Sequence, residues 1–292
     1  MKYAFWPGCV ARGAAPELYK STLAVAEHIG IELDELDAAS CTGAGIISDS
    51  DPYLQDVLNA RTMAIAEQKG LPLLDICSTC VGVHNLTREK LQNEDFRARI
   101  NERLAPEGLE YKGTADPRHL LWILLEDLEE GKLNHLITRP LNELNLGPFY
   151  GCYILRPERV LGFEEHPHRR QSLEAVINLV GATSVTYDGM TKCCGFPILT
   201  INRKNSLTMA GSHVAEAKDK GADALVTPCP LCHLNLDAQQ FDAAKVIERK
   251  LEVPILHVPQ LIGLAMGLDP EALGLNRHVV DTKPLLEKAG AL

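Results

Sequence analysis

The stretch LPLLDICSTC, residues 71–80, joins a short apolar run to a Cys-x-x-Cys motif. A second stretch, ADALVTPCPLC at 222–232, has the same form. Each apolar run has the length and composition of a short strand, and the cysteines follow where the strand ends. Ligand sites in open α/β sheets gather at such strand ends. The two stretches therefore predict an α/β fold with cysteine sites in strand-end loops.

The spacing of the cysteines indicates that the chain is a duplication. Thirty-five residues separate Cys41 from Cys77, and thirty-five separate Cys193 from Cys229. Chance rarely places a Cys-x-x-Cys at the same offset twice, so each half is expected to carry one sulfur-rich site.

The segments in front of these cysteines repeat as well. FWPGC at 5–9 is matched by PFYGC at 148–152. The interval that follows is nine residues longer in the second copy, 40 against 31. The polar stretch GFEEHPHRRQS, 162–172, accounts for the difference and is expected to be a loop insertion.

The repeat divides the chain into an N-terminal half (1–146), a C-terminal half (147–268) and a tail (269–292). Residues from about 85 to 146 are charged and leucine-rich, and we expect them to form a helical linker. In the first half, the Pro16 and Gly30 positions predict the two ends of a helix. The tail is expected to contain one short helix and no chemistry.

Composition excludes several classes of protein. The 292 residues are 46% hydrophobic and have a formal net charge of -10 without a basic run, which argues against a nucleic-acid partner. The first residues lack the apolar run of a signal peptide, and LLWILL at 120–125 is too short to span a bilayer. We expect a cytoplasmic protein without a membrane span. In a reducing compartment, nine cysteines are expected to hold metal or do redox chemistry rather than form disulfides.

The two cysteine sets differ in size. The first set is Cys9, Cys41, Cys77 and Cys80; the second is Cys152, Cys193, Cys194, Cys229 and Cys232. Four thiolates could bind one zinc ion, but five, two of them adjacent, exceed what one tetrahedral zinc accepts. They suit an iron–sulfur cluster with several irons, and zinc is the alternative. Cys229 to His233 also matches the motif for attachment of haem c, which the absence of an export signal disfavours.

This pattern of Cys, Cys-Cys-Gly and Cys-x-x-Cys, present twice, resembles the CCG domain of the heterodisulfide reductase B-subunit family, most closely the members found in heterodisulfide reductase-like sulfur-oxidation complexes. The resemblance implies two pseudo-symmetric halves, each a small open sheet with helices. It also implies a noncubane [4Fe-4S] cluster on the five cysteines of the C-terminal half, with Cys193 and Cys194 doing the catalysis.

The first copy departs from the pattern because Thr42 stands where the second cysteine of the adjacent pair would be. The resemblance then leaves Cys9, Cys41, Cys77 and Cys80 as ligands. Four thiolates match a cubane [4Fe-4S] cluster, with [2Fe-2S] as the alternative. Thr42 is interpreted as a weak oxygen ligand, as a residue that leaves one iron open, or as a packing residue.

The family resemblance implies an oxidoreductase component that carries out disulfide and thiol chemistry on small or protein-bound sulfur compounds at the C-terminal cluster, while the N-terminal cluster relays electrons. The alternative is a non-catalytic electron-transfer component of a succinate, lactate or glycolate oxidising complex. The sequence contains no nucleotide fingerprint, so electrons are expected to come from or go to another protein. The family resemblance implies that these partners are a ferredoxin-like iron–sulfur subunit and a flavin-containing subunit. Any membrane association would come through such partners.

Five side chains near the cysteines are candidates for a supporting role. Lys192, Arg156 and Arg203 could attract an anionic thiol substrate. His84 and His233 could donate a hydrogen bond to sulfur or relay a proton. Alternatively, the three cationic side chains are solvated surface charges, and the two histidines only pack in the core.

Overall fold

The computed structural model describes residues 1–128 and 131–292, and its described strands form two four-stranded parallel sheets. The first sheet has the order β2 (Glu32–Glu35), β1 (Lys2–Trp6), β3 (Leu73–Asp75) and β4 (Pro117–His119). The second has the order β6 (Thr183–Ser184), β5 (Asn145–Pro148), β7 (Ala224–Thr227) and β8 (Ile255–His257). The two orders are equivalent, which confirms the α/β fold with two pseudo-symmetric halves.

The first half contains helices of very different lengths. They are α1 (Cys9–Gly13), α2 (Pro16–Ile29), α3 (Ile47–Ser50), α4 (Pro52–Lys69), α5 (Ser78–Lys90), α6 (Glu94–Leu104), α7 (Leu120–Glu126) and α8 (Lys132–Leu136). As the sequence indicates, α2 begins at Pro16 and is ended by Gly30, whose φ of 75° lies in the left-handed region that glycine adopts without strain.

The second half repeats this arrangement, with a shorter helix after its Cys-x-x-Cys motif. Its helices are α9 (Ser172–Leu179), α10 (Arg203–Asp219), α11 (Pro230–His233), α12 (Gln240–Val246) and α13 (Val258–Ala265), and α14 (Lys283–Lys288) lies in the tail. A single π turn, Leu234–Ala238, continues α11. Short 3₁₀ turns cover 105–107, 158–160, 167–171, 188–191, 196–198 and 275–277.

The stretch expected to be a helical linker also contains a strand. β4 pairs in parallel with β3 and forms the edge of the first sheet. It is only three residues long and begins with Pro117, which an edge strand tolerates because its first N–H needs no partner. So short a strand leaves no alternating pattern in the sequence, and residues up to its end complete the first half rather than only connecting the two halves.

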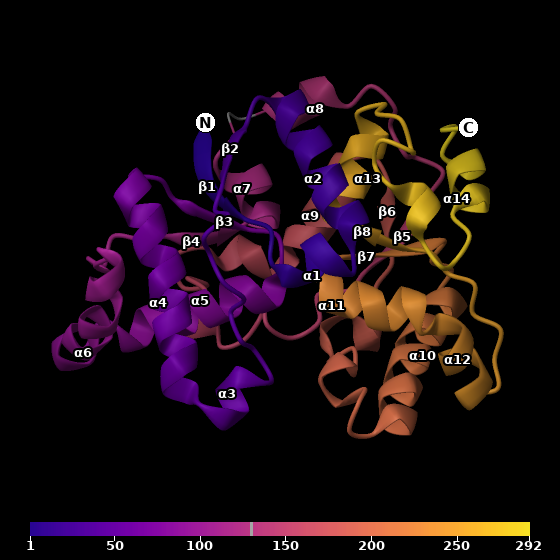
Figure 1. The fold of residues 1–292 in the computed structure, drawn as a ribbon. Helices are drawn as coiled ribbons and strands as arrows, with labels where there is room; N and C mark the ends of the chain where they lie inside the picture. Colours follow the sequence, from indigo (N-terminus) through magenta and orange to yellow (C-terminus); the bar gives the residue numbers. More distant parts are fainter. Residues whose placement is uncertain (129–130) are drawn as a thin grey trace.

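Helices of each half pack against the other half. α13, which follows the last strand of the second sheet, lies on α2, and α7, which follows the last strand of the first sheet, lies on α9 (Figure 1). The buried side chains of α2, α7, α9 and α13 belong to one continuous core. This shared core fixes how the two sheets, and the loops at their strand ends, face each other.

Candidate functional site

The structure places the cysteines in the loops and first helical turns beyond the strand ends. Cys9, Cys77, Cys152 and Cys229 come after β1, β3, β5 and β7. In both Cys-x-x-Cys motifs, the first cysteine precedes a helix and the second lies in its first turn. All nine are free thiols. The duplicated topology therefore gathers two sets of sulfur atoms at corresponding ends of the two sheets.

In the first half, the thiols of Cys9 and Cys41 lie 3.3 Å apart. The backbone N–H of Gly43 donates to Cys41 Sγ at 3.5 Å. The hydroxyl of Thr42 is 3.8 Å from Cys80 Sγ. This half thus presents four thiols and one hydroxyl.

In the second half, the backbone N–H of Gly195 donates to Cys193 Sγ at 3.4 Å, and that of Phe196 donates to Cys194 Sγ at 3.5 Å. Hydrogen bonding from Cys152 lowers the pKa of Cys193, and the same pair raises the pKa of Cys152. Cys193 is partly exposed, whereas Cys194 is buried. The five thiols form one contiguous set.

Thr42 occupies the place in the first half that Cys194 occupies in the second. The Gly43 contact to Cys41 Sγ matches the Gly195 contact to Cys193 Sγ, so the two loops share the backbone-to-sulfur hydrogen bond at this position. Thr42 is buried, and its hydroxyl faces Cys80. The substitution therefore exchanges a thiol for a hydroxyl without moving the loop away from the site.

Different helices hold these two loops in place. The side-chain amide of Asn59, on α4, donates to the carbonyl of Thr42 at 3.0 Å. The side-chain amide of Asn235, in the π turn after α11, donates to the carbonyl of Cys194 at 2.7 Å. Sequence reasoning missed both amides, because they lie far from the loops in sequence and on elements that do not correspond between the repeats.

The backbone next to the sulfurs leaves room for a cluster. Gly8 and Gly151 precede the first cysteine of each set and have φ values of 83° and 71°. A Cβ at Gly151 would lie 2.8 Å from Cys232 Sγ, and one at Gly8 would lie 3.5 Å from Cys80 Sγ. Sets of four and five convergent thiols, with glycine at the closest approach, fit iron–sulfur clusters in their donor chemistry.

The two sets meet at the start of α5. Thr79 Oγ1 lies 3.6 Å from Cys229 Sγ, and the hydroxyl of Ser78 donates to the carbonyl of Pro228 at 3.2 Å. Hydrogen bonding with Cys229 and burial raise the pKa of Cys77 well above its ordinary value. The first Cys-x-x-Cys motif therefore lies directly against the C-terminal thiol set at Cys229.

The five candidate supporting residues lie in different environments. Arg203 pairs with Asp242 at 2.9 Å, and Arg156 donates to the carbonyl of Thr191 at 2.8 Å. His84 is fully buried, with its Nδ1 2.9 Å from Asp75 Oδ2.

Of the other two, Lys192 is exposed next to the half-buried Cys193, and the ring of His233 stacks on that of His257. Sequence reasoning missed His213, whose Nε2 lies 3.1 Å from the carbonyl of Cys193, because no motif accompanies it.

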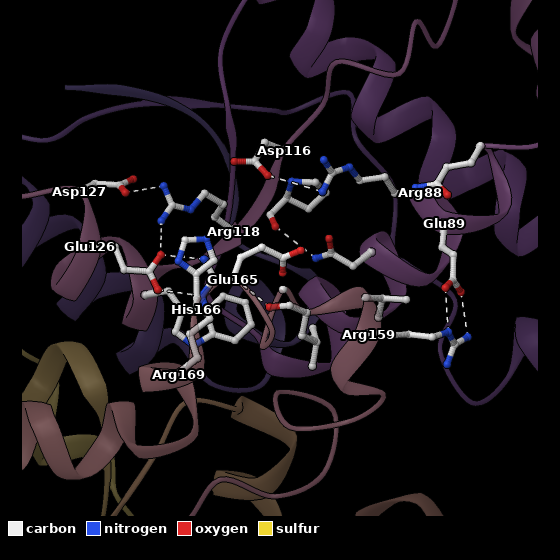
Figure 2. Close-up of a pocket in the computed structure, with 17 residues that line it drawn as sticks. Arg88, Glu89, Asp116, Arg118, Glu126, Asp127, Arg159, Glu165, His166 and Arg169 are labelled. Carbon is white, nitrogen blue, oxygen red and sulfur yellow. Dashed lines mark hydrogen bonds and ion pairs between the residues drawn. The ribbon is translucent and has the colours of Figure 1, made fainter.

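A polar cavity of about 670 Å³ lies apart from the cysteines, between α5, β4 and α7 of the first half and residues 159–169 of the second (Figure 2). Arg118 and Arg169 both pair with Glu126, and Arg159 pairs with Glu89. Although burial acts against it, hydrogen bonding from Arg169 helps to hold the pKa of Glu126 at about 2. The arginines of this cavity are thus matched by carboxylates.

The insertion expected as a polar loop is folded onto this cavity. Residues 167–171 form a 3₁₀ turn, and the side chain of Arg169 is buried over the ring of Trp122, 4.4 Å from its centroid. The ion pair with Glu126 explains why a charged stretch packs here instead of remaining solvated.

None of the described helices combines the length and apolar character that a membrane crossing requires.

Comparison with known proteins gives consistent results. The protein family described as "CCG: Cysteine-rich domain" matches residues 3–83 and 147–237. The chain is 40% identical, over 97% of its length and 99% of the relative, to the 8-methylmenaquinol:fumarate reductase membrane anchor subunit of Wolinella succinogenes. It is 31% identical, over 98% of its length and 96% of the relative, to the B component of the ferredoxin/F420H2-dependent CoB-CoM heterodisulfide reductase of Methanosarcina acetivorans.

A third relative, a protein of Archaeoglobus profundus described as like the B component of heterodisulfide reductase, is 32% identical over 93% of the chain and 92% of the relative. Among solved structures, a hypothetical protein from Helicobacter pylori superposes with a TM-score of 0.77 at 17% identity, covering 96% of this chain and 52% of that one. That likeness concerns the fold alone.

Proposed function

Because the chain belongs to the family of proteins with the cysteine-rich CCG domain, here present twice, we propose that it is the iron–sulfur electron-transfer subunit of a multi-subunit reductase complex. Its relatives are named as subunits of fumarate and heterodisulfide reductases. The iron–sulfur and redox character of the chain follows from the family, and the cluster types and partners are our proposal.

In this proposal each half of the chain binds one cluster through its own cysteines. Cys152, Cys193, Cys194, Cys229 and Cys232 hold a noncubane [4Fe-4S] cluster, and Cys9, Cys41, Cys77 and Cys80 hold a cubane [4Fe-4S] cluster. Bound clusters would supply one-electron chemistry at each site. The residues of the chain position the sulfurs, and the N–H groups of Gly43, Gly195 and Phe196 stabilise thiolate charge.

One observation carries the proposal: the two thiol sets adjoin at Cys77 and Cys229. Thr79, two residues after Cys77, places its hydroxyl against the sulfur of Cys229. Adjacent redox centres pass electrons without rearrangement of the protein, and the shared core of the two halves keeps their separation constant. The 40% identity to an anchor subunit of a quinol:fumarate reductase favours a complex of that kind. We propose that a ferredoxin-like subunit and a flavin-containing subunit are its partners and that they keep it at the membrane periphery on the cytoplasmic side.

A second candidate function is disulfide and thiol chemistry at the C-terminal cluster, with Cys193 and Cys194 at the reacting site. The complete set of five thiols and the partial exposure of Cys193 favour it. A disulfide would take up two electrons, delivered singly through the N-terminal cluster, and two protons to give two thiols. The loss of the corresponding thiol at Thr42 disfavours cleavage shared equally between two clusters, so the electron-transfer function comes first.

Electron paramagnetic resonance of the anaerobically purified protein, with iron and sulfide analysis, separates the candidates. Electron transfer predicts two clusters that dithionite reduces and an oxidised spectrum that added thiol does not change. A thiol-induced signal that disappears in Cys194→Ser and persists in Cys41→Ser would instead assign sulfur chemistry to the C-terminal site. A protein that binds zinc but neither iron nor sulfide would refute both candidates.

A further inference from the structure

A buried cluster of histidines and carboxylates lies directly behind Cys232. His233 is the next residue of α11, His257 ends β8, and Glu17 lies in the first turn of α2. Their side chains are at most 6% exposed. Asp237 and His278, also with buried side chains, lie against another side of His233. The cluster thus joins the first half, the second half and the tail.

The ring nitrogens of this cluster are poorly satisfied. Among the described residues, neither nitrogen of His233 nor Nε2 of His257 makes a hydrogen bond. Leaving a buried polar atom unpaired costs about 1–3 kcal/mol. The rings of His233 and His257 are stacked, with centroids 4.1 Å apart. Packing alone offers no compensation for three unpaired nitrogens, two of which face the carboxylate of Glu17.

The equivalent histidine of the first half has both ring nitrogens paired. His119 ends β4 as His257 ends β8, and its Nε2 lies 2.9 Å from the carbonyl of Pro228. Its Nδ1 accepts a hydrogen bond from the backbone N–H of Leu121 at 3.0 Å. The lack of a hydrogen-bond partner for His257 Nε2 is therefore specific to the second half and does not follow from the repeated fold.

We propose that Glu17 Oε1, His233 Nδ1 and His257 Nε2 bind a divalent transition-metal ion, zinc by its ligand chemistry. Glu17 Oε1 lies 3.5 Å from His257 Nε2 and 3.8 Å from His233 Nδ1. Zinc bonds of about 2.0–2.2 Å in tetrahedral geometry place two ligand atoms roughly 3.3–3.6 Å apart, so small movements suffice. Two imidazoles and one carboxylate are a ligand set that zinc accepts.

The surroundings orient the proposed ligand set. Arg277 Nε lies 3.8 Å from Glu17 Oε2, which leaves Oε1 directed at the histidines. Gln260 accepts a hydrogen bond from the backbone N–H of His257 at 2.9 Å and thereby fixes the end of β8. Such outer contacts orient metal ligands.

The site would connect α2 of the first half to β8 and α11 of the second. It would also place a positive ion one residue from Cys232 and so support the C-terminal cluster. That last consequence rests on the proposed function, whereas the metal site does not. Because a metal lies in the plane of each imidazole that binds it, the stacked rings of His233 and His257 must turn apart when the ion binds.

The test is metal analysis and zinc X-ray absorption on the anaerobically purified full chain. We expect about one zinc per chain, with nitrogen and oxygen neighbours near 2.0–2.1 Å and imidazole outer-shell scattering. His257→Gln and Glu17→Gln should lose the zinc. His168→Gln, which alters an exposed histidine elsewhere, and Cys9→Ser, which alters a thiol set, should keep it.

Two results would overturn the proposal: wild-type protein that contains no divalent metal other than iron, even after incubation with zinc, or zinc with sulfur neighbours at about 2.3 Å. The absorption measurement on wild-type protein decides the matter even if a variant fails to fold. Zinc on nitrogen and oxygen in a chain without iron would retain the metal site and refute only the proposed electron-transfer function.

Discussion

Thr79 Oγ1 lies 3.6 Å from Cys229 Sγ, although the two residues belong to different repeats. Thr79 sits between the two cysteines of the first Cys-x-x-Cys motif, while Cys229 opens the second motif. The contact shows that a side chain of the first repeat lies directly against a thiol of the second set. A change in the first repeat can therefore act on the chemistry of the second.

The first prediction concerns this hydrogen bond. Thr79→Val should lower the reduction potential of the C-terminal cluster, because a hydroxyl that donates to a thiolate stabilises the more negative, reduced state. A hydrogen bond is worth about 1 kcal/mol, and 59 mV corresponds to about 1.4 kcal/mol for one electron, so the shift should be roughly 40 mV. A redox titration followed by electron paramagnetic resonance measures it.

Thr208→Val is the control for the loss of a hydroxyl, since Thr208 is exposed on α10 and donates to the carbonyl of Lys204. It should leave both potentials unchanged. An unshifted C-terminal potential in Thr79→Val would mean that the contact with Cys229 is only van der Waals packing.

The second prediction concerns Thr42. Thr42→Cys places a fifth thiol beside Cys80, because the loop already shares the backbone-to-sulfur hydrogen bond of the Cys193–Cys194 loop. The spectrum of the N-terminal cluster should change toward that of the C-terminal cluster, while the C-terminal signal stays as in the wild type. Thr42→Val, of similar volume and without a donor, is the control. A wild-type spectrum in Thr42→Cys would show that a fifth thiol alone does not set the cluster type.

The third prediction concerns the folded insertion. Arg169→Met removes one of the two arginines that pair with Glu126. Because Arg118 remains, the expected loss is about 1.5–3 kcal/mol, the range for hydrogen bonds to a charged group. Arg170→Met is a neighbouring control, because Arg170 pairs with the exposed Glu158 and should change stability by less than about 1 kcal/mol. Urea unfolding of the anaerobic proteins measures both; equal losses would contradict a special role for the Arg169 pair.

The pH dependence of this difference has a definite sign. The pKa of Glu126 is lowered to about 2 in the folded protein, so its contribution is present above the ordinary pKa of about 4.3 and is lost only as the pH falls through about 2. The stability difference between wild type and Arg169→Met should therefore be as large at pH 5 as at pH 7. A difference that disappears by pH 5 would show that Glu126 titrates normally.

The position of the cysteines at the strand ends could be anticipated because its signals are local. Each Cys-x-x-Cys follows a strand directly, so the strand end and the ligand are specified by one short segment. The same holds for α2, where Pro16 and Gly30 lie at the two ends of one helix. The duplicated spacing then extends the inference from one half to the other.

Features that depend on distant partners could not be anticipated in this way. β4 is a strand because it pairs with the free edge of Leu73–Asp75. Its own three residues contain no alternation of apolar and polar side chains that would predict a strand. α13 packs on α2 through the apolar face of each helix, and neither face contains a sequence signal that identifies its partner. Glu17, His257 and His278 come from three separate segments and acquire meaning only when the fold brings them to His233.

The fourth prediction tests the close approach of backbone to sulfur. In Gly151→Ala the new Cβ would lie 2.8 Å from Cys232 Sγ, closer than real Cβ contacts, and φ at this position is 71°. Strain and steric conflict should together displace Cys232 and remove iron from the C-terminal site. Gly221→Ala is the matched control, because its φ is 89° and its Cβ would meet nothing within 4 Å. It should suffer only the backbone strain of about 1–2 kcal/mol and keep its iron. The measurement is the iron content and the C-terminal paramagnetic signal of the two folded variants. If both variants keep full iron, Gly151 is required only for the backbone turn before Cys152. If only Gly151→Ala loses iron, the cluster requires the free space next to Cys232.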